Sequence, residues 1–259
     1  MTGLSLADFR ILPRRISRLA NFADIALQLG VSPLKALDPQ WRSAIDILRF
    51  SLLPPQVRAN LRTLCDVGAN RGDWTAAILK LAQPQLIVAL EPIPQVFAEL
   101  KARFVDQPNV RCVQAAVGST RGEIAFNLES QTELSSIRPL SDGGRKIHGA
   151  EKSPERISVS LVTLDDELAG LDEISLLKLD VQGYENEVIR GAPKVLSRCQ
   201  CLVTEVLYER DYYEGALSFL ELARLIEETS PLRLSCVSEP ALAPNGMGAW
   251  ADAIFVKPS

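Results

Sequence analysis

Apolar and polar residues alternate along this chain in a repeated strand–helix order. Short apolar runs predict five strands, at 62–67, 86–90, 110–115, 174–179 and 200–206. Amphipathic spacing predicts helices at 73–82, 94–104, 185–197 and about 215–229, followed by strand-like runs at 232–238 and 253–256. Strands that alternate with helices are typical of a parallel, doubly wound α/β sheet.

The alternation breaks between the third and fourth predicted strands. Residues 119–163 contain two strand-like runs, at 122–128 and 157–161, separated by a segment rich in serine, glycine and charge. A connection of this length is usually functional or disordered. We expect a β excursion with a flexible flap beside the substrate cleft, and the alternative is disorder at its centre, residues 141–153.

Residues 1–60 differ from the rest of the chain. They carry eight basic and four acidic side chains, a net charge of +4, which leaves −8 for residues 61–259. Their apolar spacing is helical, and prolines interrupt it. We therefore expect a helical cap at 1–60 and a catalytic domain at 61–259. A lid, a dimer contact or a membrane-surface helix are the alternatives for the cap.

The composition is that of an ordinary globular protein. The chain has 259 residues, of which 47% are hydrophobic and 23% charged, with a net charge of −4. This charge gives the whole chain no electrostatic reason to bind nucleic acid. No apolar run is long enough to span a bilayer, and no secretion-type leader is present, so we expect a cytoplasmic protein. The pattern does not determine an oligomeric state.

Cysteine and histidine usage gives no metal signature. The five cysteines are an odd number without a C-x-x-C pair, and His148 is the only histidine. We expect reduced, buried thiols and no zinc site.

A glycine-spaced turn follows the first predicted strand. Asp66, Gly68, Asn70 and Gly72 form the pattern D-x-G-x-N-x-G, and a helix follows at once. Glycine lets a ligand approach the backbone closely, and a helix start exposes unpaired N–H groups. The turn is therefore a candidate nucleotide site.

The spacing of the turn discriminates between nucleotides. A dinucleotide fingerprint, G-x-G-x-x-G, would need glycine at positions 70 and 73, where the chain has Asn70 and Asp73. Acids in and before the turn suit a ligand with a cationic amino-acid end, such as S-adenosylmethionine. Glu91 ends the second strand, where a ribose diol is commonly bound. A structural tight turn and a nicotinamide site are the alternatives.

Further sequence blocks make the pattern more specific. They are the runs 113–118, 161–166, 176–185, 191–192 and 203–205. Together with residues 66–75 and the pair Glu91-Pro92, they resemble the FkbM-type family of S-adenosylmethionine-dependent methyltransferases over roughly residues 60–257. The family usually has an acid where this chain has Gln182.

The resemblance implies a Rossmann-like class I methyltransferase sheet whose last strand is antiparallel. It also implies O-methylation of a hydroxyl, often on a sugar or on a glycosylated or polyketide product. The expected partner is thus a small-molecule or glycan acceptor. The predicted cofactor-binding residues are Asp66, Gly68, Asn70, Gly72, Thr75, Glu91, Pro92, Ala115 and Asp180.

Methyl transfer to a hydroxyl needs a positioned oxygen and a base. Asp180, at the end of the fourth strand, is the first candidate base, although it could instead cap the helix start near Gly183. Glu205, at the end of the fifth strand, is the second candidate or a substrate ligand. Lys178 could steady an oxyanion or serve as a buried salt-bridge partner.

Other residues have weaker claims. His148 is a minor candidate base on a loop. Tyr208, Tyr212 and Tyr213 suit either a sugar-binding face or the surface start of a helix. Glu185 could pair with Arg190 or face solvent, and we do not count it among the candidate bases.

Three further alternatives remain open. A divalent metal is not favoured, because the amide of Gln182 is a poorer ligand than a carboxylate. The chain could also be a non-catalytic methyltransferase-like binding module. An NAD-dependent oxidoreductase is the weakest of the three alternatives.

Overall fold

The computed structural model describes residues 52–150, 153–208, 212–243 and 245–258. Residues 1–51, which form most of the predicted helical cap, lie outside this description, so the cap stays a prediction. The described chain begins with a short helix, α3 (Pro55–Arg58).

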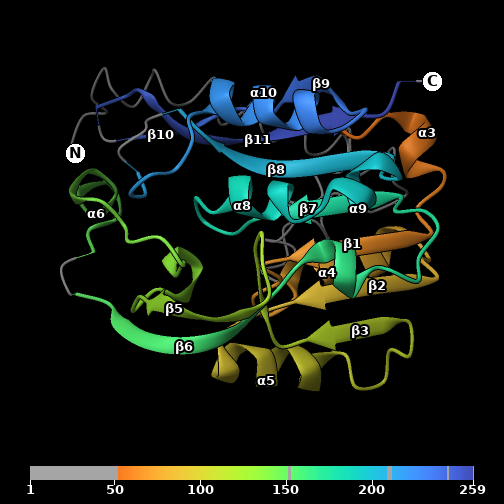
Figure 1. Ribbon diagram of the computed structural model, residues 1–259, viewed down its shortest axis with the longest axis horizontal. Coiled ribbons are helices and arrows are strands. Elements are labelled where there is room, and N and C mark those ends of the chain that lie inside the picture. Colours follow the sequence, from red (N-terminus) through yellow and green to blue (C-terminus); the bar gives the residue numbers. More distant parts are fainter. Residues whose placement is uncertain (1–51, 151–152, 209–211, 244, 259) are drawn as a thin grey trace, which may run out of the picture. The chain divides into compact units, whose positions relative to one another are not determined.

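An eight-stranded sheet forms the centre of the described unit (Figure 1). Its strands are β1 (Thr63–Val67), β2 (Leu86–Leu90), β3 (Val110–Val113), β7 (Leu176–Leu179), β8 (Cys201–Leu207), β9 (Arg233–Val237), β10 (Ala241–Leu242) and β11 (Gly248–Val256). The order is β10-β11-β8-β7-β1-β2-β3, with β9 also paired to β11. Neighbours from β3 to β8 are parallel and β11 runs antiparallel to β8, which confirms the predicted class I sheet.

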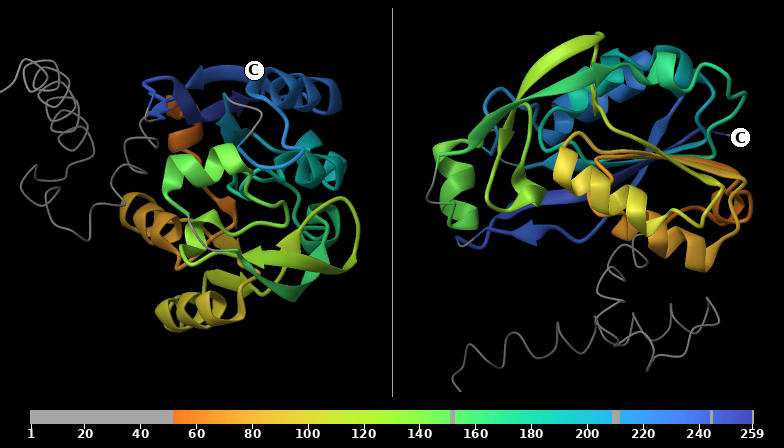
Figure 2. Two further views of the ribbon diagram at one scale, coloured as in Figure 1. Left: turned by 90° about the vertical axis from the view of Figure 1, so that its left-hand side faces the viewer. Right: turned by 90° about the horizontal axis from the view of Figure 1, so that it is seen from below.

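Helices cover both faces of this sheet, as the view from below shows (Figure 2). They are α4 (Asp73–Leu81), α5 (Pro94–Arg103), α7 (Leu164–Glu167), α8 (Glu185–Arg190), α9 (Pro193–Ser197) and α10 (Phe219–Thr229). Helices α8, α9 and α10 pack over the face that carries Cys65 and Val67. The opposite face carries Ala89, which packs with Leu100 and Phe104 of the α5 region.

Two predicted helices have different bounds in the structure. The helix predicted at 185–197 is two helices, because Gly191 ends α8 and Pro193 occupies the first turn of α9. The helix predicted from 215 starts only at Phe219, where Ser218 and Glu221 form a capping box.

The long connection after the third strand folds into a second, three-stranded sheet. It contains β4 (Ala116–Val117), β5 (Gly122–Leu128), the 3₁₀ turn η3 (Thr132–Leu134), α6 (Asp142–His148) and β6 (Glu155–Val162), with strand order β4-β6-β5. The expected β excursion is therefore confirmed.

The disorder alternative is wrong for the segment that forms α6. The hydroxyl of Ser141 caps this helix by accepting the N–H of Gly144. Arg145 then reaches the buried carboxylate of Glu129, with 2.8 Å between Nη2 and Oε1. Two specific contacts thus hold a segment that its composition marked as a loop.

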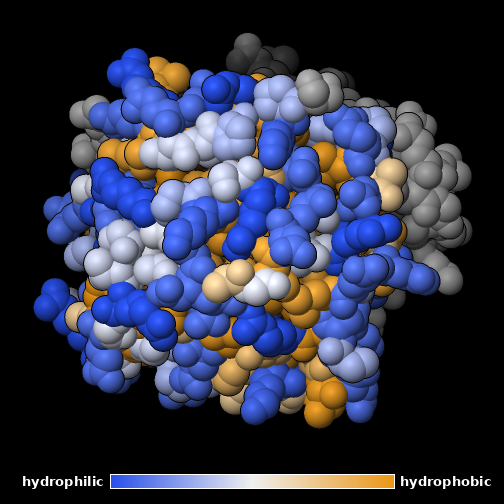
Figure 3. Space-filling view, turned by 45° about the vertical axis from the view of Figure 1, so that its right-hand side comes forward, coloured by the Kyte–Doolittle hydropathy of each residue, from blue (hydrophilic) through white to orange (hydrophobic). Residues whose placement is uncertain are grey.

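Hydrophilic side chains cover much of the face in Figure 3, with smaller apolar areas between them. Among the helices that the structure describes, none is long and apolar enough to cross a membrane. The described residues contain no group of three or more histidine, cysteine or acidic side chains placed to hold a metal ion. All five cysteines are free thiols, and Cys65, Cys199 and Cys201 are buried.

Candidate active site

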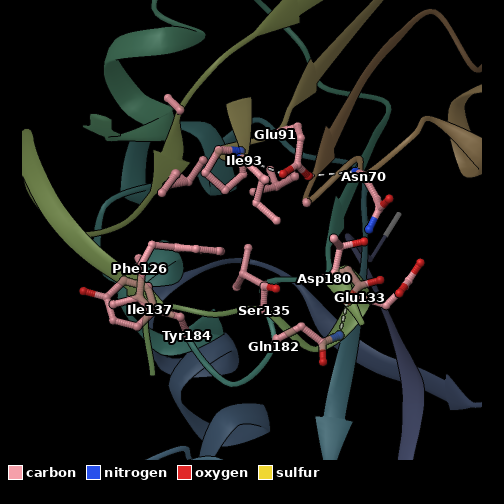
Figure 4. Close-up of a pocket in the computed structure, with 18 of the residues that line it drawn as sticks. Asn70, Glu91, Ile93, Phe126, Glu133, Ser135, Ile137, Asp180, Gln182 and Tyr184 are labelled. Carbon is pink, nitrogen blue, oxygen red and sulfur yellow. Dashed lines mark hydrogen bonds between the residues drawn. The ribbon is translucent and has the colours of Figure 1, made fainter. Parts of the chain in front are cut away.

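A cavity of about 230 Å³ lies at the carboxyl ends of β1, β2 and β7. Figure 4 shows Phe126, Ile137 and Tyr184 gathered at one end, and Asn70, Glu133 and Asp180 at the other. One end is therefore largely apolar and the other polar. The site thus has the place that the sheet topology predicts, beyond the carboxyl ends of parallel strands.

The glycine turn forms the floor of the polar end. Gly68 has φ of +74°, and a Cβ there would lie 1.9 Å from the carbonyl oxygen of Asp180. Only glycine allows the end of β1 to lie this close to the end of β7. Gly72 caps α4 with φ of +79°, but its missing Cβ makes room for Phe104 and Leu100. Gly72 therefore serves packing and is not among the described residues that line the cavity.

Glu91 lies at the end of β2 and lines the cavity. Its carboxylate accepts the backbone N–H groups of Asn70, at 2.9 Å, and Ile93, at 2.8 Å. Burial raises the pKa of Glu91 to about 7, although these two hydrogen bonds oppose the shift. The turn and the acid predicted from the sequence are thus joined directly, and the carboxylate is held in one orientation.

Asp66, Thr75 and Lys178 lie beneath the cavity floor. Asp66 is fully buried and accepts the Thr75 hydroxyl at 2.7 Å and the Lys178 ammonium at 3.0 Å. Lys178 also donates to the Gly68 carbonyl at 3.3 Å. The salt-bridge interpretation of Lys178 is confirmed. None of the three is among the described residues that line the cavity, so their predicted contacts with cofactor or substrate stay predictions.

Asp180 follows β7, and its side chain is 38% exposed at the cavity. Oδ1 accepts the Gln182 amide at 2.7 Å, and Oδ2 lies 3.6 Å from Lys178 Nζ. Among the candidate bases, Asp180 is the one that the described residues place on the cavity wall.

Glu185, the first residue of α8, binds the backbone of the loop before this helix. Its buried carboxylate accepts the Val181 N–H at 3.1 Å, and burial raises its pKa to about 7. The expectation that Glu185 pairs with Arg190 or faces solvent is wrong, because Arg190 pairs with Glu187. Acidic side chains are rarely buried in proteins. No feature of the sequence around Glu185 indicated that this residue would be buried.

The remaining candidates are not among the described residues that line the cavity. Glu205 is opposite Asp252 in the β8–β11 ladder. His148 contacts the hydroxyl of Tyr212, and burial lowers its pKa. Tyr212 and Tyr213 are buried, so both the sugar-face and the surface-helix interpretations are wrong for them, whereas Tyr208 is partly exposed.

The connection at residues 119–163, called the insertion below, supplies the opposite wall of the cavity. The prediction from the sequence placed this segment beside the cleft but did not identify its lining residues. They are Phe126, Thr132, Glu133, Ser135 and Ile137. Arg71 of the glycine turn reaches across to this wall, 3.3 Å from Thr132 Oγ1 and 3.5 Å from Glu133 Oε1. The only signal in the sequence was the length of the insertion, which does not identify individual residues.

Comparison with known proteins places these features in a family. The profile described as "Methyltransferase FkbM domain" matches residues 66–230. The 2-O-methyltransferase NoeI of Sinorhizobium fredii is 29% identical over 171 residues, which cover 63% of this chain and 70% of NoeI. Methyltransferase 1 of Beauveria bassiana is 26% identical over 143 residues, covering 49% of this chain and 57% of the relative.

A solved structure supports the same fold. The FkbM methyltransferase of Methylobacillus flagellatus superimposes with a TM-score of 0.50 at 15% identity, covering 93% of this chain. The present chain spans 59% of the length of that protein. The matched profile, the strand order and the strand-end cavity agree, and the chain therefore belongs to the FkbM family of methyltransferases.

Proposed function

We propose that this protein transfers a methyl group from S-adenosylmethionine to a hydroxyl of a sugar or of a glycosylated or other secondary-metabolite acceptor. The carrying observation is that Gly68, Glu91 and Asp180, from the ends of three strands, meet in one cavity. The name of the relative NoeI, a 2-O-methyltransferase, supports oxygen as the methylated atom.

The cavity suggests an orientation for the cofactor. The methionine end would lie over Gly68 and Asn70, and the ribose hydroxyls would donate to Glu91. The adenine would lie toward the apolar end, near Pro92 and Ala115. Asp66, Gly72 and Thr75 would then support the methionine site from below through the contacts described above.

Asp180 is the proposed general base. The bound cofactor supplies a methyl group already activated on a sulfonium, so the chain must mainly orient the acceptor and remove its proton. The acceptor hydroxyl gives its proton to the Asp180 carboxylate while its oxygen bonds to the methyl carbon and the carbon–sulfur bond breaks. Lys178 would hold Asp180 in place, and Glu205 stays a second candidate as base or substrate ligand.

Cofactor binding is tested first, by calorimetry with S-adenosylhomocysteine and with NADH as the control. We expect micromolar binding of the first compound and none of the second. Glu91→Ala should weaken S-adenosylhomocysteine binding by about 1–3 kcal/mol, because it leaves ribose hydroxyls unpaired. The exposed acid Glu123 gives a matched control, Glu123→Ala. An unchanged Kd in Glu91→Ala would remove the ribose assignment.

Turnover is tested next, with a screen of sugars and glycosylated metabolites. Asp180→Asn should lower kcat by about 10²–10⁴-fold, the usual contribution of a general base, with the Kd of S-adenosylhomocysteine unchanged. If Asp180→Asn keeps its turnover, the base is another group. If the protein binds S-adenosylhomocysteine but methylates no acceptor, the non-catalytic binding module becomes the better interpretation.

The proposal also covers the class of acceptor, the location of the protein and the need for a metal ion. The net charge of −4 supports a small-molecule or glycan acceptor rather than nucleic acid. A cytoplasmic location stays a prediction. No metal ion is required by the proposed chemistry.

A further inference from the structure

Three side chains form a hydrogen-bonded series that runs from the core to the cavity lining. The Tyr213 hydroxyl lies 2.7 Å from the Gln182 amide oxygen, and the Gln182 amide nitrogen lies 2.7 Å from Asp180 Oδ1. Tyr213 is fully buried, and Gln182 and Asp180 both line the cavity. The series therefore links a core residue to the proposed base.

The backbone around Gln182 is shaped for this contact. Gln182 has φ of +56°, a conformation that is uncommon for a residue with a side chain. The next residue, Gly183, has φ of +87°, and a Cβ there would lie 2.7 Å from Cβ of Tyr213. The loop is thus pressed against Tyr213, at a cost in strain that packing must offset.

In the structure the series runs from the core residue as donor to the carboxylate as acceptor. Burial raises the pKa of Tyr213 well above its usual value, so its hydroxyl keeps its proton and acts as a donor. In the structure this hydroxyl donates to the amide oxygen of Gln182. The amide nitrogen is left to face Asp180, where it donates to the carboxylate.

We propose that Gln182 and Tyr213 are positioning residues that hold Asp180 as an ionised, correctly oriented proton acceptor. This inference rests on the proposed role of Asp180 in methyl transfer. A hydrogen bond to the charged form of a carboxylate favours that form, so the series keeps Asp180 able to take a proton. An acid at position 182 could not donate in this way unless it shared a proton with Asp180.

The structure also offers Tyr213 a second acceptor, the Leu134 carbonyl, at 3.2 Å from its hydroxyl. Once Asp180 has taken the substrate proton, Tyr213 can donate to Leu134, and the Gln182 amide can turn. Its oxygen then accepts the new proton of Asp180, and its nitrogen donates to the Tyr213 oxygen. The same three side chains thus satisfy both protonation states of the base.

Several other charged groups act on this series. Lys178 on β7 faces Asp180 directly, and Glu185 on α8 interacts with it electrostatically. Asp66 on β1 binds the same Lys178 ammonium, and Glu133 of the insertion lies at the same end of the cavity. The negative charge of Glu205 on β8 helps to raise the pKa of Tyr213. The substitutions below leave all five groups unchanged.

The test is a ¹³C NMR titration of carboxyl groups in the full chain saturated with S-adenosylhomocysteine. The Asp180 signal is the one that Asp180→Asn removes. Tyr213→Phe should raise the midpoint pH of this signal by roughly one unit, since it removes the hydroxyl that orients the amide. Gln182→Glu should raise it by roughly two units or more, because two carboxyl groups would share one site.

Tyr212→Phe is the matched control, because Tyr212 is also buried but contacts His148 instead of Gln182. We expect the wild-type midpoint in this variant. If Tyr213→Phe does not fold, as judged by its melting transition, Gln182→Met takes its place with the same expected rise.

Unchanged midpoints in both the position-213 or replacement variant and Gln182→Glu would overturn the inference. An equal rise in Tyr212→Phe would also overturn it, since the effect would then be general to the core. These outcomes are distinct from failure of the proposed function, which would show as no S-adenosylhomocysteine binding by calorimetry or as full turnover in Asp180→Asn.

Discussion

The two walls of the cavity are built on different principles. The sheet wall consists of strand ends and tight turns, where Gly68 and Glu91 are fixed by parallel register and backbone hydrogen bonds. The insertion wall depends on side chains that reach across space, such as Arg71 to Glu133, whose side chain is 66% exposed. The sheet wall is thus rigid by construction.

The largest expected effect comes from breaking the sheet wall at Gly68. Gly68→Ala would force a Cβ against the Asp180 carbonyl at a left-handed backbone position. We expect a loss of about 3 kcal/mol in the free energy of unfolding, together with loss of S-adenosylhomocysteine binding. Urea unfolding and calorimetry would measure the two effects.

Gly170→Ala is the matched control, since a Cβ there meets nothing within 4 Å. It should change stability by less than about 0.5 kcal/mol. Equal stability of the two variants would show that the close approach of β1 and β7 is not required.

A smaller effect is expected from breaking the insertion wall alone. Arg145→Met removes the partner of the buried Glu129 carboxylate, at a cost of about 2 kcal/mol because Arg145 is itself partly exposed. Hydrogen exchange should become faster in the insertion, residues 119–163, and stay unchanged in β1 and β2. Faster exchange in both regions would mean that the two walls are one cooperative unit.

The smallest effect is expected in the pH dependence of S-adenosylhomocysteine binding, which tests Glu91 of the sheet wall. Glu91 is raised to a pKa of about 7 by burial, so it gains a proton as the pH falls through 7. Ribose hydroxyls donate best to the ionised carboxylate, so S-adenosylhomocysteine affinity should rise with pH up to about 7 and then level off. The slope should approach tenfold per pH unit below that point.

Glu91→Gln does not titrate, so its affinity should be flat over the same range. The sign for stability is opposite to the usual carboxylate case. Since the folded pKa of Glu91 lies above its unfolded value, this group lowers stability as the pH rises from about 4.5 to 7, and the penalty is then constant. If Glu91→Gln binds S-adenosylhomocysteine with the wild-type pH dependence, the group that titrates is a residue other than Glu91.

Much of the sheet wall could be predicted from local patterns. The predicted bounds of β2, residues 86–90, agree with the structure, and the Asp66–Gly72 turn lies where the strand–turn–helix pattern predicts it. Glu91 and Asp180 both line the cavity, as expected for residues at the carboxyl ends of parallel strands. Asp66 and Glu205 are not among the described lining residues. The third strand was predicted two residues too long, because no turn residue marks its end at Val113.

The burial of individual polar groups could not be predicted. Glu185 and Tyr213 look like surface residues in the sequence, because each stands in a polar stretch. Their positions depend on contacts with segments far along the chain, such as Leu134 for Tyr213. The insertion residues Phe126 and Ile137 are a similar case, since neither follows a motif.

The sequence by itself determined the family, the class of the sheet, and two strand-end residues that line the cavity, Glu91 and Asp180. These properties follow from short stretches of sequence. The spacing of hydrophobic residues determines the helices and strands, and the spacing of glycines determines the turn. Only the tertiary structure decided that Asp66 and Lys178 pair beneath the floor, that the insertion forms a wall, and that Tyr213 reaches Asp180 through Gln182. Those contacts join residues distant in sequence, and their geometry exists only once the core has packed.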